Sequence, residues 1–224
     1  MRTIGRNLLR GLLLPAAILL SSAPARSAGL WLLPDPASIE ADRDIAVRLF
    51  EGEPFQGEER LFYGAPNIRF QRLWKKGREN LSAVRQGKPA AIFRPTEAGV
   101  QLVGFSSPAT GDYCKALMVV GDAGRDDPLR WSELGHRLEI VPQSDPVVLL
   151  ESGGMLQVQV LFEREPLAAA RITAIPQVAP VEGRMKGTTD EIGLVSFPLH
   201  RPGLWMIKVE RSSLSATLVL EAGQ

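Results

Sequence analysis

The chain has 224 residues, with 26 lysines and arginines against 25 aspartates and glutamates, and 45% of its residues are hydrophobic. Nucleic-acid binding requires a clustered basic surface, and this near-neutral composition predicts no nucleic-acid partner. Cys114 is the only cysteine, so no internal disulfide can stabilise the fold and hydrophobic cores must do so. We expect Cys114 itself to be a buried thiol in a strand, although an intermolecular disulfide stays open.

Residues 1–28 have the pattern of a secretory signal peptide. Three arginines among the first ten residues precede an apolar core at residues 11–20 and a small-residue tail at residues 21–28. The apolar core is too short to span a bilayer, which needs roughly 20 apolar residues. We therefore expect cleavage after Ala25 or Ala28, and a periplasmic or secreted protein with no membrane span after cleavage.

The rest of the chain consists of short runs with period-two alternation, separated by many of its 17 prolines and 21 glycines. No stretch keeps helical periodicity for three turns, so the pattern predicts an all-β fold. The expected strands cover residues 30–33, 44–50, 60–63, 68–73, 90–93, 100–106, 115–120, 137–141, 155–162, 170–175, 195–199, 205–210 and 216–221. This number of strands favours two tandem Ig-like or prealbumin-like β-sandwiches.

An internal repeat supports the same arrangement. Residues 49–55 (LFEGEPF) and 161–167 (LFEREPL) match at five of seven positions. In each copy we interpret the motif as a strand end, a turn and a return set by proline. Further on, Gly99 and Gly203 each introduce an alternating apolar strand, and we expect both to adopt a positive φ.

The polar, turn-rich segment after Val120 predicts the boundary between the two units. We expect a first β-sandwich domain at residues 29–121, a linker at 122–135 and a second β-sandwich domain at 136–222.

Several segments resemble one known family. They are CKALMVVG from Cys114, LGHRLEIVPQSDPVVL from Leu134, LQVQVLFEREPLAAARITAI from Leu156 and TTDEIGLVSFPLHRPGLWMIKV from Thr188. Together with the start GLWLLP at Gly29, they resemble secreted bacterial proteins of unknown function that are grouped with periplasmic components of cobalt and nickel uptake systems. The second half alone also resembles the prealbumin-like modules of carboxypeptidase regulatory regions and collagen-adhesin repeats.

The resemblance implies an exported accessory protein that helps to capture or hand over Ni²⁺ or Co²⁺, with a membrane transporter component or another envelope protein as partner. Two positions depart from the family. Members usually begin the mature chain with a histidine and an acidic residue, where this chain has Gly29 and Leu30. Members often carry a further histidine where this chain has Glu210 and Arg211.

Few residues remain as candidate metal ligands. His136 and His200 are the only histidines, and a first-row transition metal normally needs three or four convergent ligands. We expect both histidines at the surface or in turns, with a shared metal site as the alternative. Asp122, Asp126 and Asp127 could supply carboxylate oxygens to Ca²⁺, although their spacing is not that of an EF-hand and a solvated linker is the competing interpretation.

Trp74 and Trp131 are the candidate interface residues. Both lie in polar surroundings, and exposed tryptophans near cations are common in binding hot spots. Trp205 alternates with apolar residues, so we expect it in a core.

The sequence carries none of the common catalytic motifs, such as the G-x-S-x-G elbow or H-E-x-x-H. We therefore predict a non-enzymatic binding or accessory protein associated with nickel or cobalt uptake. The alternative is a structural adhesion or assembly module that binds a protein or glycan partner.

Overall fold

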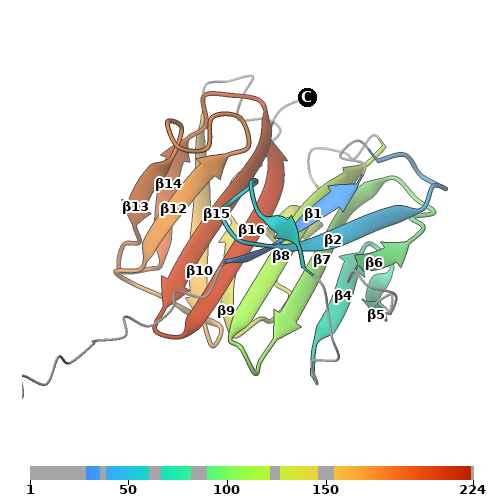
Figure 1. Ribbon diagram of the computed structural model, residues 1–224, viewed down its shortest axis with the longest axis horizontal. Helices are drawn as coiled ribbons and strands as arrows, with labels where there is room; N and C mark the ends of the chain where they lie inside the picture. Colours follow the sequence, from blue (N-terminus) through green and yellow to red (C-terminus); the bar gives the residue numbers. More distant parts are fainter. Residues whose placement is uncertain are drawn as a thin grey trace, which may run out of the picture.

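The computed structural model describes residues 29–35, 39–60, 67–81, 90–121, 127–145 and 154–222. These residues form an all-β protein with one short 3-10 helix (Figure 1). Among them, no helix is long and apolar enough to cross a membrane. The predicted signal peptide lies outside the described residues.

The strands fall into two sets along the chain. The first half contains β1 (Leu30–Asp35), β2 (Ile45–Glu51), β3 (Glu58–Glu59), β4 (Arg69–Trp74), β5 (Gly77–Leu81), β6 (Ala90–Phe93), β7 (Gly99–Ser107) and β8 (Asp112–Val120). The 3-10 helix η1 (Pro128–Trp131) precedes the second half, which contains β9 (Leu138–Pro142), β10 (Met155–Phe162), β11 (Glu165–Pro166), β12 (Arg171–Pro176), β13 (Met185–Thr188), β14 (Leu194–Pro198), β15 (Gly203–Arg211) and β16 (Leu214–Ala222).

The two halves repeat the same strand pairings. In the first half β2 pairs with β1, β3 and β6, while β4 pairs with β5 and β7, and β7 with β8. The second half repeats this order eight strands later, from β9 to β16. The repeated sequence motif is the β2–β3 connection in one half and the β10–β11 hairpin in the other, as expected from its turn residues.

The halves are joined by a direct pairing of β8 with β16. These two strands run parallel, in register from Asp112 opposite Ser215 to Ala116 opposite Val219. One four-stranded sheet from each half thereby joins into a single eight-stranded sheet, in the order β13-β12-β15-β16-β8-β7-β4-β5 (Figure 1). The other sheet of each half, built around β2 or β10, stays separate. Because equivalent strands pair in parallel, an approximate twofold axis runs along the strands and turns one half over relative to the other.

This inversion places the two smaller sheets on opposite faces of the large sheet. The side chains of β7 and β8 alternate between two cores, as strand geometry requires. Val103, Phe105, Cys114, Ala116 and Met118 belong to the core under β1 and β2. Val100, Leu102 and Leu117 instead join the core that β9, β10, β12, β15 and β16 form.

The first half also covers part of the second. Trp31 of β1 is 1% exposed and packs with Met206 and Val219, which lie on the face of β15 and β16 that is turned away from the second half's own core. Its ring also stacks on Phe50, with 5.7 Å between the ring centroids. Each half therefore buries apolar surface of the other, beyond the strand pairing itself.

The structure confirms the predicted all-β class and most of the predicted strands. The positive φ values expected at Gly99 and Gly203 are present, at 140° and 110°. The predicted strand at residues 60–63 falls largely outside the described residues. Four strands were not predicted: β3 and β11 are only two residues long, and the edge strands β5 and β13 are largely polar. The predicted division into domains stays a prediction, and the shared sheet shows how closely its two units are connected.

Gly57 is the position where the β2–β3 connection tolerates no side chain. A Cβ there would lie 2.3 Å from both the carbonyl oxygen of Glu51 and the Trp31 ring. We expect Gly57→Ala to lower the free energy of unfolding by about 2 kcal/mol or more, because the clash involves backbone. Gly203→Ala is the control, since its Cβ would meet no atom within 4 Å and only its φ is unfavourable. Denaturant unfolding measures both, and equal losses would contradict this account.

Candidate functional site

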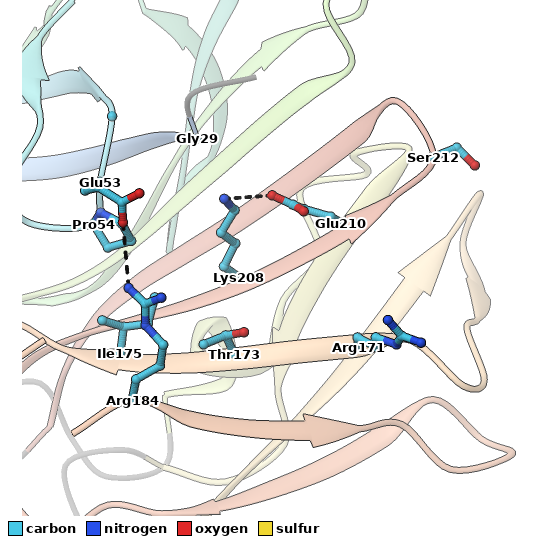
Figure 2. A pocket seen from close by; sticks show the side chains of 11 residues that line it. Gly29, Glu53, Pro54, Arg171, Thr173, Ile175, Arg184, Lys208, Glu210 and Ser212 are labelled. Atoms are coloured by element: carbon cyan, nitrogen blue, oxygen red, sulfur yellow. Dashed lines mark ion pairs between the residues drawn. The ribbon is translucent and has the colours of Figure 1, made fainter. Parts of the chain in front are cut away.

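The described residues form an open groove of about 800 Å³ on the outer face of the second half. Its floor is the β12–β15 part of the large sheet, and one side is formed by the start of β1 and the β2–β3 connection (Figure 2). It is lined by Gly29, Gly52, Glu53, Pro54, Arg171, Thr173, Ile175, Arg184, Lys208, Glu210 and Ser212. The groove therefore lies where the two halves meet.

Strand alternation explains why the floor of this groove is polar. On β12, Ile172 and Ala174 face the core, so Arg171 and Thr173 must face outward. On β15, Ile207 and Val209 face the same core and Lys208 points outward between them. Thr173 and Lys208 are cross-strand partners in the centre of the floor.

Three cations line the groove, and two of them contact carboxylates. Lys208 Nζ lies 2.8 Å from Glu210 Oε1, and an Arg184 nitrogen lies 3.7 Å from Glu53 Oε2 (Figure 2). The Arg171 side chain is exposed and forms no hydrogen bond or ion pair with another described residue. Exposed pairs of this kind contribute at most about 1 kcal/mol each, so an anion could compete for these cations.

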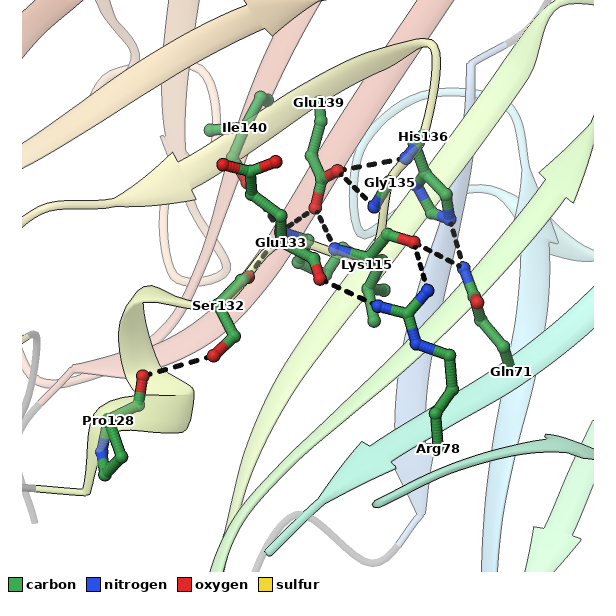
Figure 3. A network of polar contacts seen from close by, with 11 residues as sticks. Gln71, Arg78, Lys115, Pro128, Ser132, Glu133, Gly135, His136, Glu139 and Ile140 are labelled. Carbon is green, nitrogen blue, oxygen red and sulfur yellow. Dashed lines mark hydrogen bonds and ion pairs between the residues drawn. The ribbon is translucent and has the colours of Figure 1, made fainter. Parts of the chain in front are cut away.

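The equivalent face of the first half is filled instead of open. There the cross-strand pair is Gln71 with Gly104, and the segment 132–136 passes over it (Figure 3). Gln71 Nε2 lies 3.4 Å from the carbonyl oxygen of Leu134 and 3.2 Å from Nε2 of His136. Arg78 donates to the carbonyl oxygens of Leu134 and Glu133 at 3.0 and 3.1 Å.

The covering segment is held from below by the buried carboxylate of Glu139. This carboxylate accepts hydrogen bonds from the backbone N–H groups of Leu134, Gly135 and His136, at 2.7, 2.8 and 3.0 Å (Figure 3). It also forms an ion pair with Lys115, and both side chains are 2% exposed. Lys115 Nζ donates further to the carbonyl oxygen of Ile140 at 3.1 Å.

Burial and the mutual attraction of these groups set their charges. Burial of the His136 ring lowers its pKa from 6.5 to about 4, so the ring is neutral at pH 7. The pKa of Glu139 is also lowered, because the attraction of Lys115 and His136 together with the hydrogen bonds to Glu139 outweighs burial, the largest single influence, which acts to raise it. Burial lowers the pKa of Lys115, and the attraction of Glu139 opposes that change. The network is therefore one of paired charges beneath a neutral histidine.

The fold does not require this charged pair. By the pairing registers, Lys115 on β8 corresponds to Thr217 on β16, and Glu139 on β9 corresponds to Trp31 on β1. Thr217 donates its hydroxyl to the carbonyl oxygen of Leu30 at 2.9 Å. A neutral arrangement thus serves the second half where the first uses an ion pair.

The structure separates the two predicted histidines. His136 is 6% exposed, with its ring 5.6 Å from that of Tyr113, so its predicted surface position is wrong. The hydrogen bonds to the Glu139 carboxylate and the burial of Leu134 hold the segment that carries His136 against the first half's sheet. His200 lies in the exposed turn before β15, as expected.

The aspartate cluster can be followed only at Asp127, because Asp122 and Asp126 lie outside the described residues. Asp127 caps η1, accepting from the backbone N–H of Leu129 at 3.0 Å, and also accepts from the N–H of Val100 at 2.9 Å. Both of its oxygens therefore serve the backbone. Within the described ranges, no three His, Cys, Asp or Glu residues come together as a metal-binding group.

The remaining candidates are partly or fully buried. Trp74 is half-buried, with the Arg72 guanidinium 4.5 Å from its ring centroid, and Trp131 is half-buried in η1. Their interface role stays a prediction. Cys114 is 1% exposed in β8, and burial raises the pKa of its thiol, which confirms the expected buried cysteine. Trp205 is 3% exposed, which confirms its core position.

Sequence reasoning did not find the groove. Arg171, Arg184 and Lys208 are spread over almost forty residues, and each is an ordinary outward residue of a strand or turn. Only the pairing register brings them together. The internal repeat was the available signal. Aligning the two halves places Lys208 at the position of Gly104 and shows that a cation replaces a glycine there.

Comparisons with known proteins give a family match without a function. Residues 105–213, just under half of the chain, match the model of a family described as a domain of unknown function, DUF4198. No curated protein matches the sequence.

Several solved structures show a weak similarity to this chain. The D0-D1 domain of Intimin is 12% identical, with 88% of this chain and 99% of that chain covered and a TM-score of 0.26. An alpha-2-macroglobulin fragment from Escherichia coli, spanning domains NIE-MG1, is 9% identical, with 89% and 99% covered and a TM-score of 0.27. A two-domain fibronectin type-III segment of chicken tenascin is 11% identical, with 85% and 97% covered and a TM-score of 0.26. With such scores they say nothing about function.

Removal of one member of the buried pair leaves an uncompensated charge. We expect Lys115→Met to lower the free energy of unfolding by about 3 kcal/mol or more, since the Glu139 carboxylate loses its cation. The double variant Lys115→Met with Glu139→Gln should be more stable than Lys115→Met alone, because it buries no charge. Denaturant unfolding of the three proteins tests this. A double variant less stable than the single one would contradict the assigned role of the pair.

The neutral state of His136 predicts a loss of stability in acid. Its pKa is lower in the folded chain than in the unfolded one, so between pH 6.5 and about 4 only the unfolded chain takes up the proton. Over this range the group contributes a loss of roughly 1 kcal/mol per pH unit. An NMR titration of the His136 ring, assigned with His136→Gln, should show no protonation until near pH 4. A midpoint near 6.5 would show that the ring is accessible.

Proposed function

We propose that this chain is an exported, non-enzymatic binding protein that holds a partner in the groove between the β2–β3 connection and the β12–β15 face. The observation that carries the proposal is the contrast between equivalent faces of the two halves. The face around Gln71 and Gly104 is covered by the chain itself, whereas no described segment covers the face around Thr173 and Lys208, where three cations and two carboxylates line the groove.

The chemistry of the groove favours a macromolecular partner over direct capture of a metal. Arg171, Arg184 and Lys208 would repel Ni²⁺ or Co²⁺, and guanidinium and ammonium groups are not ligands at pH 7. In the uptake role that the family resemblance implies, the chain would act as an accessory protein that contacts a transporter component through this groove. The alternative is an adhesion or assembly module that uses the groove for another surface protein or a glycan.

Site-specific photocrosslinking in cells of the source organism tests the groove as the binding site. A photoreactive residue at Thr173 should crosslink to an envelope component, and the additional change Lys208→Glu should abolish the product. The same residue placed at Lys75, in an exposed turn of the first half, is the control. Crosslinking at Lys75 and none at Thr173 would refute the groove, and the identity of the product decides between a transporter component and a surface molecule.

Calorimetric titration with Ni²⁺ and Co²⁺ tests direct capture separately. We expect no binding heat at micromolar metal from His136, because its ring is buried against Gln71 and Tyr113. Binding that is lost in the double variant His136→Ala with His200→Ala would contradict this expectation. Binding that survives in that variant would place the metal site on other residues.

A further inference from the structure

We propose that the groove binds an extended acidic peptide segment of its partner, laid across β12 and β15 as residues 132–136 lie across β4 and β7. The inference rests on the proposed function and names the chemistry of the ligand. It follows from comparing the two halves position by position along their matched strand registers.

The registers identify four corresponding positions. Gln71 pairs with Gly104 in the first half, and Thr173 pairs with Lys208 in the second. Arg78 pairs with Leu73 in the first half. Arg184 lies one residue before the start of β13, and continuing the β12–β13 register places it at the position that corresponds to Arg78. Trp31 opposite Phe50 corresponds to Glu139 opposite Leu161, so Gly29 corresponds to Arg137.

Arg78, which corresponds to Arg184 in the second half, shows how the sheet holds a segment that crosses it. Arg78 donates to two successive backbone carbonyl oxygens, those of Glu133 and Leu134. Arg184 lines the groove from the corresponding place, and its carboxylate contact, to Glu53, is as long as 3.7 Å. Glu53 is exposed, so Arg184 can exchange this contact for the carbonyl oxygens of an incoming segment at little cost.

The two halves differ in whether the floor residue or the chain above it carries the larger side chain. In the first half the floor residue is Gly104, and a Cβ there would lie 2.5 Å from Leu134 and 3.0 Å from His136, so the bulk belongs to the covering segment. In the second half the floor residue is Lys208, and a Cβ on Gly29 would lie 2.9 Å from Lys208 Nζ. A segment crossing here meets an ammonium group where residues 132–136 pack against a glycine without a side chain.

The ligand must therefore bring negative charge. Lys208 and Arg171 flank the crossing path on neighbouring strands, and Arg171 has no partner among the described residues. A carboxylate of the bound segment would pair with Arg171 or compete with Glu210 for Lys208. The backbone carbonyl groups of the same segment would accept hydrogen bonds from Arg184. Charge-assisted hydrogen bonds of this kind are about twice as strong as neutral ones. In an extended segment every second side chain points toward the floor, so alternating acidic and small residues would direct the carboxylates at the cations.

Fluorescence anisotropy with a labelled octapeptide of alternating glutamate and alanine tests the inference on the purified, exported protein. We expect saturable binding that weakens as salt is raised from 50 to 500 mM, because the Debye screening length falls to about 4 Å at the higher concentration. Arg184→Ala and Lys208→Ala should each weaken binding by about fivefold or more. Lys75→Ala should leave it unchanged, and circular dichroism should show that all variants are folded.

A matched peptide with glutamine in place of glutamate separates charge from shape. Equal affinity for both peptides would overturn the acidic specificity, and binding unaffected by Arg184→Ala would overturn the path across the groove. Competition by free glutamate as effective as that by the peptide would show an anion site without segment recognition, which also overturns the inference. If no peptide binds but Thr173 still crosslinks to an envelope component, the inference fails while the proposed function stands. If both fail, the proposed function falls as well.

Discussion

The parallel pairing of β8 with β16 determines the rest of this structure. Each half is a small sandwich of two four-stranded sheets, and the sheet that it contributes to the joint sheet keeps an outer face that its own second sheet does not cover. Pairing equivalent strands in parallel turns one half over, so that the smaller sheet of each half stands on the opposite face of the joint sheet. Trp31 can then cover Met206 and Val219, and the segment before β9 can cover Gln71 and Gly104. Without this pairing neither contact would form, and the groove would lose one of its sides.

The approximate symmetry makes departures from it informative. Packing alone would allow the same residues on both sides of the axis, yet the residues that correspond to Lys115 and Glu139 in the other half are Thr217 and Trp31. Buried ion pairs seldom stabilise a fold more than apolar residues of similar size, so this pair is better understood as fixing the covering segment in place. Three backbone N–H groups that would otherwise lack acceptors bind the Glu139 carboxylate. On the corresponding face of the other half no described residue forms such an anchor, and this face is the floor of the groove.

Much of the fold follows from local sequence patterns. Alternation predicted most strands because one face of nearly every strand is buried, and the Leu-Phe-Glu-x-Glu-Pro repeat correctly indicated a duplicated unit. The edge strands β5 and β13 were missed because they bury little and carry polar residues such as Arg78 and Lys186. His136 was misplaced since nothing near it in sequence shows that Gly104, more than thirty residues earlier, leaves room for its ring. The groove was invisible for the same reason: its cations converge only through pairings between distant strands.

The central claim is that the two halves form one cooperative sheet through β8 and β16. Native-state hydrogen exchange measures this directly at the amides of residues 112–116 and 215–219. If the account is correct, the protected amides in these strands exchange only through global unfolding, with a free energy equal to that of the most protected amides in both cores. If these amides exchange through a lower-energy opening, while each half keeps its own protected core, the halves are independent sandwiches that merely touch and the account is wrong.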